Sequence, residues 1–590
     1  MLRNIFCGAA LLLLAQGVIA AELRISGAPE PLEENIRAHI GELPELGETL
    51  SRAYRERLID QAREAAMALG YYEAAFSVAR IEQDGDPVLR ITVDPGEQVR
   101  LGEVRLAVNG PGSDDPAFRD LLARAPLKEG APLNHGEYDS VKSGILNLAR
   151  RRGYFEGKFS ASRVEVDLVE RSARVDLVYE SGPRYRLGEV RFTEVPLRDA
   201  FLERMIPFEP DAPYEASHIT ELNRILLETR YFDTVLVRPL PEQAENLRVP
   251  VEVTLAMAER NRVGVGVGYS TDTGPRLRLS WDKPWINDSG HSVGADLETS
   301  QVRQGITGRY RIPLRDPAND ALEFRGGYVE EDINDAESKL ITASIQRQQQ
   351  FSSGWIRSLY LRLEREEFTV GEEDVSGDGR LERISTLVLP GISFTRTRSR
   401  GGLDPTWGDR FTVTLEGTDE VLGSDVELLR LRLGSRWVRA YDRHRLFLRL
   451  DGGAIETPSL DDVPVSLRFF AGGDQSVRGF DLDTISPRNA DGDAIGGLYL
   501  LTGSAEYTYE FKPRWRAALF VDAGNATNDF DEPFKVGAGF GVHWVSPVGP
   551  VRLELAWPVD SGDLQDNDPT APNYEKLGGP EIHISLGPRL

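Results

Sequence analysis

The 590-residue sequence predicts a transmembrane antiparallel β-barrel of about sixteen strands, preceded by three smaller α/β domains. Three observations lead to this fold class. A unit of one strand, two helices and two strands occurs three times in the first 260 residues. Apolar and polar residues then alternate from Asn261 to the C-terminus, which is the weak signal that membrane β-strands leave in a sequence. Short and long connections between these alternating segments follow one another along the chain.

The first twenty residues, 1–20, have the features of a signal peptide. Arg3 supplies the positive start, residues 5–14 form an apolar run too short to span a membrane, and residues 18–20 form a small-residue cleavage site. An N-terminal membrane anchor is the alternative. Cys7, the only cysteine, lies inside this segment. The mature chain would therefore have no thiol for disulfides, thiolate catalysis or cysteine-bound zinc.

The composition excludes two further classes of structure and partner. No other window of the sequence approaches the roughly 20 consecutive apolar residues of a membrane helix. The formal net charge is −25 at pH 7. Because phosphate backbones are bound by clustered Lys and Arg, this acidity argues against nucleic acid as a partner.

Two short patterns define the repeated unit. Leu-Gly-Glu-Val-Arg at residues 101–105 returns at residues 187–191, each time after an alternating strand and a glycine turn. In the first two units a glycine supplies the left-handed helix end, whereas Arg230 stands there in the third and predicts a different helix end. An aromatic residue pair follows this position in every unit, within residues 70–73, 153–156 and 230–233. The expected domains are residues 21–97, 98–183 and 184–260.

The remaining residues, 261–590, show the alternation of barrel strands. Leu359, Leu361 and Leu363, for example, alternate with Arg362 and Glu364. A soluble β-sandwich also alternates, but inward arginines on strand after strand favour a wet lumen. Bacterial barrels join their strands by short periplasmic turns and longer external loops. The expected short connections are residues 350–353, 441–444, 512–514 and 546–550, and the long ones are residues 369–380, 456–495 and 558–578.

The connection at residues 456–495 has neither a helix nor a strand period. A structureless segment of this length is uncommon in a compact domain and is usually functional or disordered, and its three phenylalanines argue against disorder. We therefore expect it to fold into the barrel lumen and to carry Arg478 with it. On the next two strands the alternation points Glu506 and Asp522 inward, where both carboxylates would pair with the guanidinium.

These residues also carry a family resemblance. The motif Val477-Arg478-Gly479-Phe480 resembles the sixth-loop motif of the BamA/TamA superfamily of POTRA-barrel proteins, and the three repeats resemble POTRA domains. Glu506 and residues 520–524 and 546–552 resemble the motifs of the neighbouring strands. Three repeats are most similar to the TamA family (translocation and assembly module outer-membrane subunit), because BamA proteins carry five. The chain departs from the superfamily at residues 587–590, Gly-Pro-Arg-Leu, where an aromatic end is typical.

The resemblance implies an outer-membrane location with the POTRA domains in the periplasm. It implies an activity without covalent chemistry, and so neither an enzyme nor a cofactor: the insertion or translocation of client outer-membrane proteins such as autotransporters. The implied partners are a periplasm-spanning protein of the TamB type on the POTRA domains, the client proteins and outer-membrane lipid. A two-partner-type secretion pore, although the plug helix of that class is not found, and a lipid-transport component of the outer membrane are the alternatives.

The first and last barrel strands are predicted to meet in a weak seam. Gly264, Gly266 and Gly268 lie on the inner face of the first strand, and glycine weakens a strand. The last strand ends at Gly587 and Pro588, and proline cannot donate to the ladder. An opened seam would expose backbone edges on which a client strand could pair. Barrel curvature without opening is the alternative explanation of the glycines.

Patterns typical of enzymes and metal sites are weak. The seven histidines show no HExxH spacing, and no GxSxG nucleophile elbow occurs. Residues 264–268 contain the glycines of a nucleotide-binding loop without its helix. Residues 374–379 begin like a calcium loop, with Ser385 where the closing Glu belongs. The sequence predicts no catalytic residue and no bound metal, and the loop in the lumen disfavours a diffusion pore.

Overall fold

The computed structural model of the chain describes residues 22–43, 50–83, 86–333, 336–370, 383–402, 404–489, 492–529, 531–547, 549–560 and 579–587. The predicted signal peptide with Cys7, the calcium-like residues 374–379 and Pro588 lie outside the described residues. The chain divides into two compact units. One contains the barrel together with the segments Phe192–Pro207 and Glu221–Val237, and the other contains the first two α/β domains and the remaining segments of the third.

Three α/β sheets precede the barrel, with strand orders β1-β3-β2, β4-β6-β5 and β7-β9-β8. In the first two sheets the central strand pairs in parallel with the first strand and antiparallel with the other. The first domain contains β1 (Glu22–Ser26), α1 (Glu30–Ile40), α2 (Arg52–Ala68), β2 (Ala75–Gln83) and β3 (Asp86–Asp94). The second contains β4 (Arg100–Asn109), η1 (Gly110–Asp114), α3 (Pro116–Ala123), α4 (His135–Arg151), β5 (Lys158–Asp167) and β6 (Ser172–Glu180). The third contains β7 (Arg186–Phe192), α5 (Asp199–Leu202), η2 (Glu203–Met205), α6 (Ala216–Glu228), β8 (Phe232–Pro239), η3 (Pro241–Gln243) and β9 (Arg248–Met257).

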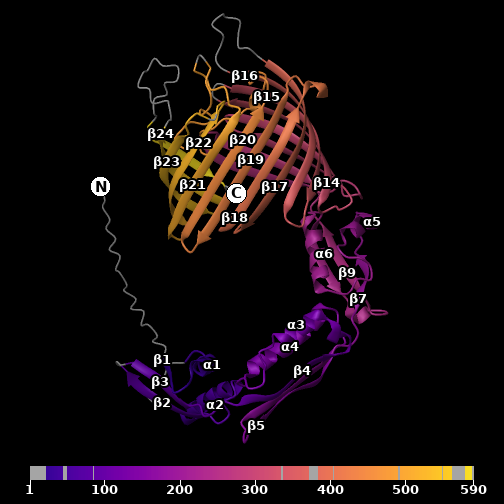
Figure 1. The fold of residues 1–590 in the computed structure, drawn as a ribbon, viewed down its shortest axis with the longest axis vertical. Helices are drawn as coiled ribbons and strands as arrows, with labels where there is room; N and C mark the ends of the chain where they lie inside the picture. Colours follow the sequence, from indigo (N-terminus) through magenta and orange to yellow (C-terminus); the bar gives the residue numbers. More distant parts are fainter. Residues whose placement is uncertain are drawn as a thin grey trace, which may run out of the picture. The chain divides into compact units, whose positions relative to one another are not determined.

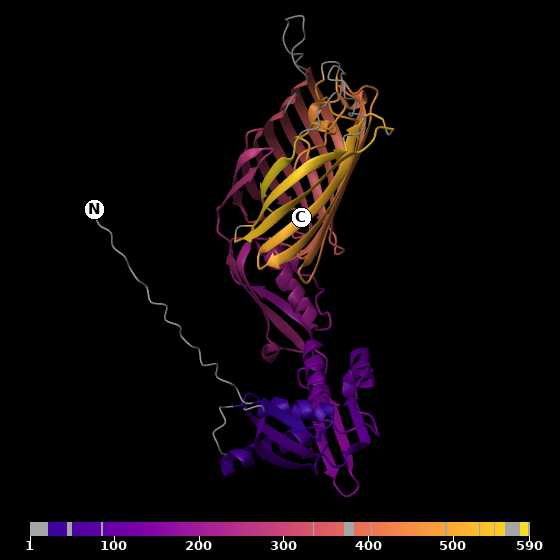
Figure 2. The ribbon, with the colours of Figure 1, turned by 90° about the vertical axis from the view of Figure 1, so that its left-hand side faces the viewer.

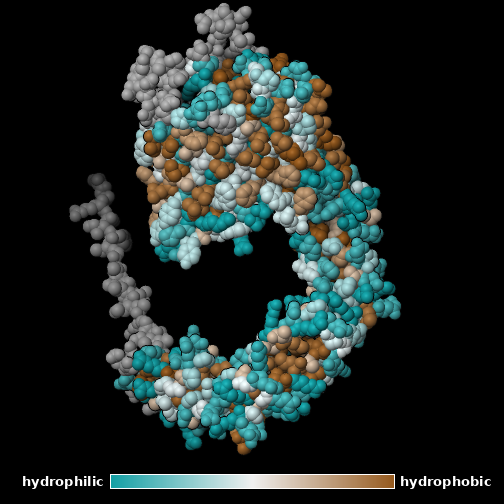
Figure 3. All heavy atoms as spheres, viewed as in Figure 1, coloured by the Kyte–Doolittle hydropathy of each residue, from teal (hydrophilic) through white to brown (hydrophobic). Residues whose placement is uncertain are grey.

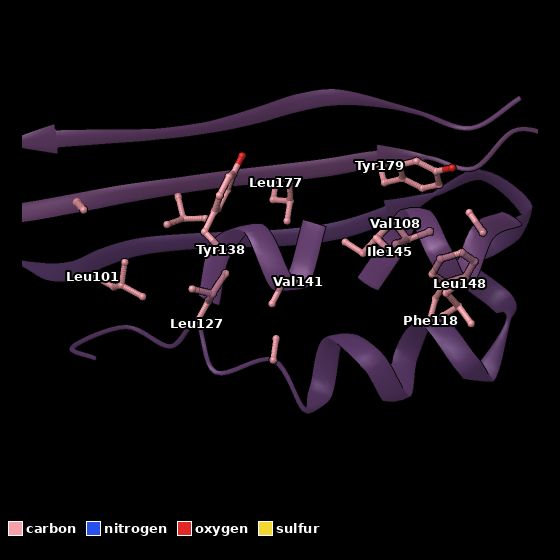
Figure 4. Packing of buried hydrophobic residues seen from close by; sticks show 14 of the residues in the cluster. Leu101, Val108, Phe118, Leu127, Tyr138, Val141, Ile145, Leu148, Leu177 and Tyr179 are labelled. Carbon is pink, nitrogen blue, oxygen red and sulfur yellow. The ribbon is translucent and has the colours of Figure 1, made fainter. Parts of the chain in front are cut away.

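The second domain shows how such a unit forms its core (Figure 4). The Asn134 side chain caps α4 by accepting hydrogen bonds from the backbone N–H groups of residues 136 and 137. One face of the helix, at the spacing of helical turns, then packs against the sheet. The buried residues of this face are Tyr138, Val141, Ile145, Leu148 and Ala149. Among the described residues, no helix has both the length and the apolar composition needed to cross a membrane.

The helix ends agree with the sequence in two domains and correct it in the third. Gly70 and Gly153 follow α2 and α4 with φ of 84° and 81°. The different end predicted for the third unit is wrong, because Arg230 takes the same left-handed conformation with φ of 61°. The next residue, Tyr231, is buried and donates its hydroxyl to the Gly290 carbonyl at 2.7 Å. This contact fixes the chain directly after the turn, so arginine adopts a conformation that non-glycine residues take only uncommonly.

Strands β10 to β25 form one closed barrel in chain order (Figure 1, Figure 2). The sixteen strands confirm the predicted fold class. Their bounds are β10 (Arg262–Ser270), β11 (Gly274–Lys283), β12 (Ser292–Thr299), β13 (Arg303–Pro313), β14 (Asp320–Ile333), β15 (Ala336–Gln350), β16 (Trp355–Val370), β17 (Arg383–Arg400), β18 (Trp407–Thr418), β19 (Leu428–Tyr441), β20 (His444–Glu456), β21 (Tyr499–Lys512), β22 (Trp515–Thr527), β23 (Lys535–Ser546), β24 (Gly549–Asp560) and β25 (Glu581–Leu586).

The side of the barrel that Figure 3 shows carries a band of exposed apolar residues. On β16, the outward side chains of Leu359, Leu361 and Leu363 are 42%, 42% and 50% exposed. Glu364 and Glu366, which alternate with them, are buried on the inner side. An exposed aliphatic band around a closed antiparallel barrel is the arrangement that hydrocarbon lipid requires.

Connection lengths follow the predicted rule only in part. Residues 442–443 make a short turn after β19, and residues 457–498 make a long loop after β20, the eleventh barrel strand. Over the first strands the rule is wrong, because β10 and β11 are joined by residues 271–273 and β11 and β12 by the longer segment 284–291. The longer segment contacts the third α/β domain: the Asp288 carbonyl accepts a backbone hydrogen bond at 3.1 Å from residue 198.

Candidate functional site

The described part of the loop after β20 lies in the barrel lumen, against inward-facing side chains. Its apolar residues are buried together with leucines of β17, and Phe469 and Phe480 are thereby shielded from water. The members of this cluster include Leu387, Leu389, Val463, Leu467, Phe469, Val477, Phe480 and Ile485. The loop is therefore packed as a core and not as an exposed connection.

The two ends of the loop are tied together by Arg468. Its guanidinium donates to the Val463 and Ile495 carbonyls, each at 2.8 Å. On the barrel wall, Glu366 of β16 accepts the Ser466 backbone N–H at 3.1 Å. These polar contacts satisfy backbone groups that a buried irregular segment would otherwise leave unpaired.

Arg478 is the centre of the loop's contact with the wall, and its side chain is 2% exposed. Its Nε and Nη2 bind the two Asp522 carboxylate oxygens at 2.7 and 2.9 Å. Its Nη1 binds Glu506 and Glu554, both at 2.9 Å. The Ser504 hydroxyl accepts the remaining Nη2 proton at 3.2 Å. The structure thus brings together the three residues that the sequence singles out and adds a third carboxylate.

The backbone around Arg478 also lies close to the backbone of the barrel wall. The guanidinium lies 3.5 Å from the centroid of the Phe520 ring, a cation–π contact. Gly479 has φ of 93°, and a side chain there would meet the backbone of Trp557 at 2.8 Å. On β23 a methyl group at Gly537 would strike the Arg478 carbonyl oxygen. Glycine at both positions lets the loop lie directly on the wall.

Three carboxylates around one guanidinium make this cluster dependent on Arg478. Arginine suits the site because its planar fork can bind Asp522 with two nitrogens while a third nitrogen reaches the glutamates. Removing one partner of a buried ion pair typically costs ~3–5 kcal/mol, because the other charge stays buried without compensation. Here three carboxylates would lose the cation that they share.

Sequence reasoning missed several residues of the site. Glu554 on β24 follows the same alternation that placed Glu506 inward, so its inward direction was predictable. Nothing in the sequence indicated that it lies level with Arg478 along the barrel axis. Arg449 on β20 donates to the backbone carbonyls of Gln475 and Ser476. No sequence signal marks Arg449, because its partners are main-chain atoms of a loop whose path is not periodic.

One group of side chains in the described residues has the donor set of a metal site. One ligand atom each of Glu506, His543 and Glu554 lies within 4.8 Å of the other two. The same two glutamates bind Arg478, and His543 Nε2 lies 2.8 Å from Glu554 Oε1. Because the Arg478 guanidinium already supplies the positive charge, the arrangement is explained without a metal ion.

The seam between the first and last barrel strands is closed by very little backbone pairing. β10 pairs with β11 along its whole length, residues 262–270, but with β25 only through Ser270 and Ser585. Beside that pair, the Thr271 N–H donates to the Ile584 carbonyl at 3.2 Å. Within the described barrel strands, the next shortest pairing is β24 with β25, which extends over residues 551–556.

The predicted seam residues lie at both margins of this weak closure. Gly264, Gly266 and Gly268 pair with β11 only. A methyl group at Gly266 or Gly268 would meet its nearest neighbours at 3.7 or 3.9 Å, an ordinary contact distance, so packing does not require glycine at either position. Gly587 follows β25 with φ of 133°.

The lumen loop contacts both margins of the seam. On the β10 side, Asp474 donates its backbone N–H to Asp272 Oδ2 at 2.6 Å and accepts the Ser270 hydroxyl at 2.9 Å. On the β25 side, the Gly479 N–H donates to His583 Nε2 at 3.3 Å. Directly across the seam, His583 Nδ1 lies 3.7 Å from Asp272 Oδ1. We call these five residues the seam cluster.

Comparisons with known proteins agree with this architecture. A family model described as the Omp85 superfamily domain matches residues 259–587, and a model described as POTRA domain TamA domain 1 matches residues 22–95. The outer membrane protein assembly factor BamA of Nitratidesulfovibrio vulgaris is 28% identical over 516 residues, which cover 84% of this chain and 64% of that protein. The chain therefore spans slightly less than two thirds of that relative's length.

Two further proteins are similar at lower identity. The outer membrane protein assembly factor BamA of Neisseria meningitidis serogroup B is 21% identical over 564 residues, covering 83% of this chain and 68% of that protein. The crystal structure of BamA from Haemophilus ducreyi lacking POTRA domains 1–3 superposes with a TM-score of 0.68 at 17% identity, covering 83% of this chain and 99% of that chain. At this identity the likeness concerns the fold.

The superfamily model matches more than half of the chain, and its match includes all sixteen barrel strands with the lumen loop. The chain belongs to the Omp85 superfamily.

Proposed function

We propose that the chain is an outer-membrane assembly factor that inserts or translocates client outer-membrane proteins through the seam between β10 and β25. One observation carries this proposal: the backbone pairing across the seam is limited to the register pair Ser270 and Ser585 and one adjacent hydrogen bond. An unsatisfied backbone group in hydrocarbon costs several kcal/mol, so an almost unpaired strand edge is poised to pair with another strand. The similar proteins of Nitratidesulfovibrio vulgaris and Neisseria meningitidis carry the name of outer membrane protein assembly factors.

The client would enter by strand addition. The edge of β10 that faces away from β11 carries donors and acceptors along residues 263–269, and the described β25 pairs with none of them. A client strand added to this edge gains a main-chain ladder that needs no particular side-chain sequence. Such a mechanism suits a factor that acts on many different client proteins, without covalent chemistry.

Within the superfamily, we assign the chain to the TamA family with autotransporter-like clients. The match of the TamA first-domain model to residues 22–95 supports this assignment. The assigned organisation is a signal peptide at 1–20, POTRA domains at 21–97, 98–183 and 184–260, and a barrel at 261–590 in the outer membrane. The POTRA domains would lie in the periplasm and dock a TamB-type partner along a sheet edge, for which the edge strands β1, β2, β4 and β5 are available.

A disulfide across the seam tests the mechanism. Ser270→Cys combined with Ser585→Cys places two thiols at the one register pair of the seam. We expect the oxidised double variant to lose client insertion into proteoliposomes and to regain it on reduction, because a covalent link holds the edge of β10 closed. Insertion is measured as the heat-resistant, protease-protected form of an autotransporter barrel.

Ser358→Cys combined with Ser393→Cys is the matched control, since these serines are register partners in the continuous ladder of β16 and β17. This disulfide should leave insertion intact. Full insertion by the oxidised seam variant would refute a function through the seam.

A further inference from the structure

We propose that the barrel end at which β10 begins carries a binding site for a phosphate-bearing anion. The site is a cavity of about 470 Å³ between the turn that follows α6, residues 228–231, and the adjacent ends of β11, β13 and β15. These segments belong to the same compact unit. We call this cavity the basic vestibule, and its basic lining residues are Arg230, Arg262, Lys283, Arg309, Arg311 and Arg325.

The charge of the basic vestibule is opposite to that of the chain. Six basic side chains line it, against the three acidic side chains Glu228, Asp282 and Glu323. The whole chain has a formal charge of −25. A concave surface lined by one sign of charge concentrates the field of its charges, and this one would attract anions locally.

Only half of these cations are neutralised by carboxylates. Arg262 binds Asp233 at 2.7 Å, Arg309 binds Asp282 and Asp296, and Arg325 binds Glu323. Within the part of the chain that the structure describes, the side chains of Arg230, Lys283 and Arg311 have no hydrogen bond and no ion pair. The three unpaired cations come from three different elements, the turn after α6, β11 and β13.

The wall beside Arg311 is buried and fixed. Burial raises the pKa of Tyr231 to about 12, and the nearby charges of Arg311 and Arg204 act in the opposite direction. The Tyr231 hydroxyl is already used by the Gly290 carbonyl, so it holds the wall in place and does not compensate the arginine. Next to such a partly dry wall, an unpaired positive charge acts more strongly on a ligand than it would in water.

The chemistry of the cations favours a phosphate group. Two guanidinium groups can each offer paired N–H donors to the oxygens of a phosphate, and a lysine adds a point charge. Cavities of ~300–1,000 Å³ are typical of small-molecule sites, so the basic vestibule has room for a phosphorylated headgroup as well as for a free phosphate ion. Both sources share the recognised group, and an experiment can separate them.

The test is isothermal titration of the mature full-length chain in a non-ionic detergent at constant ionic strength. The three probes are inorganic phosphate, dihexanoyl-phosphatidylglycerol and zwitterionic dihexanoyl-phosphatidylcholine. We expect saturable binding of at least one of the first two. Binding of phosphatidylglycerol alone identifies a lipid headgroup as the source, whereas binding of inorganic phosphate identifies a free phosphate group. Absence of binding for both, or equal binding of phosphatidylcholine, overturns the proposal.

Variants connect the binding to the basic vestibule. Lys283→Gln combined with Arg311→Gln should weaken binding at least tenfold, since both substitutions remove charge-assisted hydrogen bonds to the anion. Arg311→Lys keeps the charge but loses the paired N–H donors of the guanidinium, so its affinity should lie between those of the parent and Arg311→Gln. Arg276→Gln combined with Arg432→Gln removes two charges from a different cavity of the barrel and should bind like the parent. Unchanged affinity of the double variant, with its barrel shown to be folded by heat-modifiability on a gel, also overturns the proposal.

Discussion

At Arg478, carboxylates from three different strands, β21, β22 and β24, meet a guanidinium that the loop between β20 and β21 carries into the lumen. The same side chain lies on the Phe520 ring, and its own backbone N–H donates to Asp522 at 3.1 Å. The position of the loop is thus coupled to the three carboxylates, because the loop carries the guanidinium that neutralises them.

Arg478→Ala should release the loop. The substitution leaves Glu506, Asp522 and Glu554 buried without their cation, and we expect a loss of about 3–5 kcal/mol of loop stability. The measurement is the rate of limited proteolysis within residues 457–498. Gln475→Ala, which changes a neighbouring side chain, should leave the rate near that of the parent. Equal protease sensitivity of the two variants would remove the special status of Arg478.

Some side chains of the site could be predicted from the sequence and others could not. The alternation along β21 and β22 was sufficient to turn Glu506 and Asp522 inward. It was not sufficient to find Arg449, whose partners are the carbonyl groups of Gln475 and Ser476. A backbone acceptor has no residue type, so a contact of this kind leaves no pattern in the sequence.

At the scale of single elements, Asp115 joins α3 to the end of α4 in the second α/β domain. Its carboxylate caps α3 by accepting the Ala117 N–H at 3.0 Å and binds Arg152 Nε at 2.6 Å. Burial by itself raises the pKa of this carboxyl, but the contacts with Arg152, Ala117 and Arg184 outweigh it and hold the pKa below its ordinary value.

These contacts predict an acid-sensitive helix pair. Because the pKa of Asp115 in the folded domain lies below the unfolded value of about 3.9, the carboxylate stabilises the fold above that value, and the stabilisation is lost as the pH falls through the folded pKa. Hydrogen-exchange protection of α3 and α4 should therefore fall as the pH is lowered from 6 to 3. Asp115→Asn should be less protected at pH 6 and nearly independent of pH. Asp120→Asn, an exposed carboxylate on α3, is the control, and an Asp115→Asn variant with the parent's acid response would contradict the assignment.

The glycines of β10 can be tested in the same way. Gly266→Ala combined with Gly268→Ala should stabilise β10 by about 0.4–1 kcal/mol for each substitution, since alanine has fewer unfolded conformations and finds room at both positions. We expect a higher temperature for the heat-modifiability shift and slower client insertion. Gly308→Ala with Gly326→Ala changes register partners inside the fully paired β13 and β14, where the added methyl groups also find room, and should not slow insertion. Parent-like insertion by the β10 variant would favour curvature as the role of its glycines.

At the scale of the whole molecule, the alternation of apolar and polar residues predicted the barrel because the two faces of a membrane strand have different solvents. Connection lengths predicted the loop after β20 but not the segment 284–291, because that segment contacts the third α/β domain through Asp288 and Gly290. The number of residue pairs across the seam was not predictable either. Glycines indicate that β10 is weak, but the register of two strands at opposite ends of the barrel sequence depends on closure of the whole ring.

The seam cluster connects the lumen loop to both margins of the seam, so movement of the loop and opening of the seam are coupled. Asp474 and Gly479 belong to the loop that lies in the barrel interior, and they touch opposite margins of the seam. A displacement of this loop would therefore open the lumen along the barrel axis and, at the same time, break the contacts that hold the two margins of the seam together. Sideways release into the bilayer and leakage along the axis would then begin together, so current bursts in a planar bilayer should coincide in time with the transfer of a client.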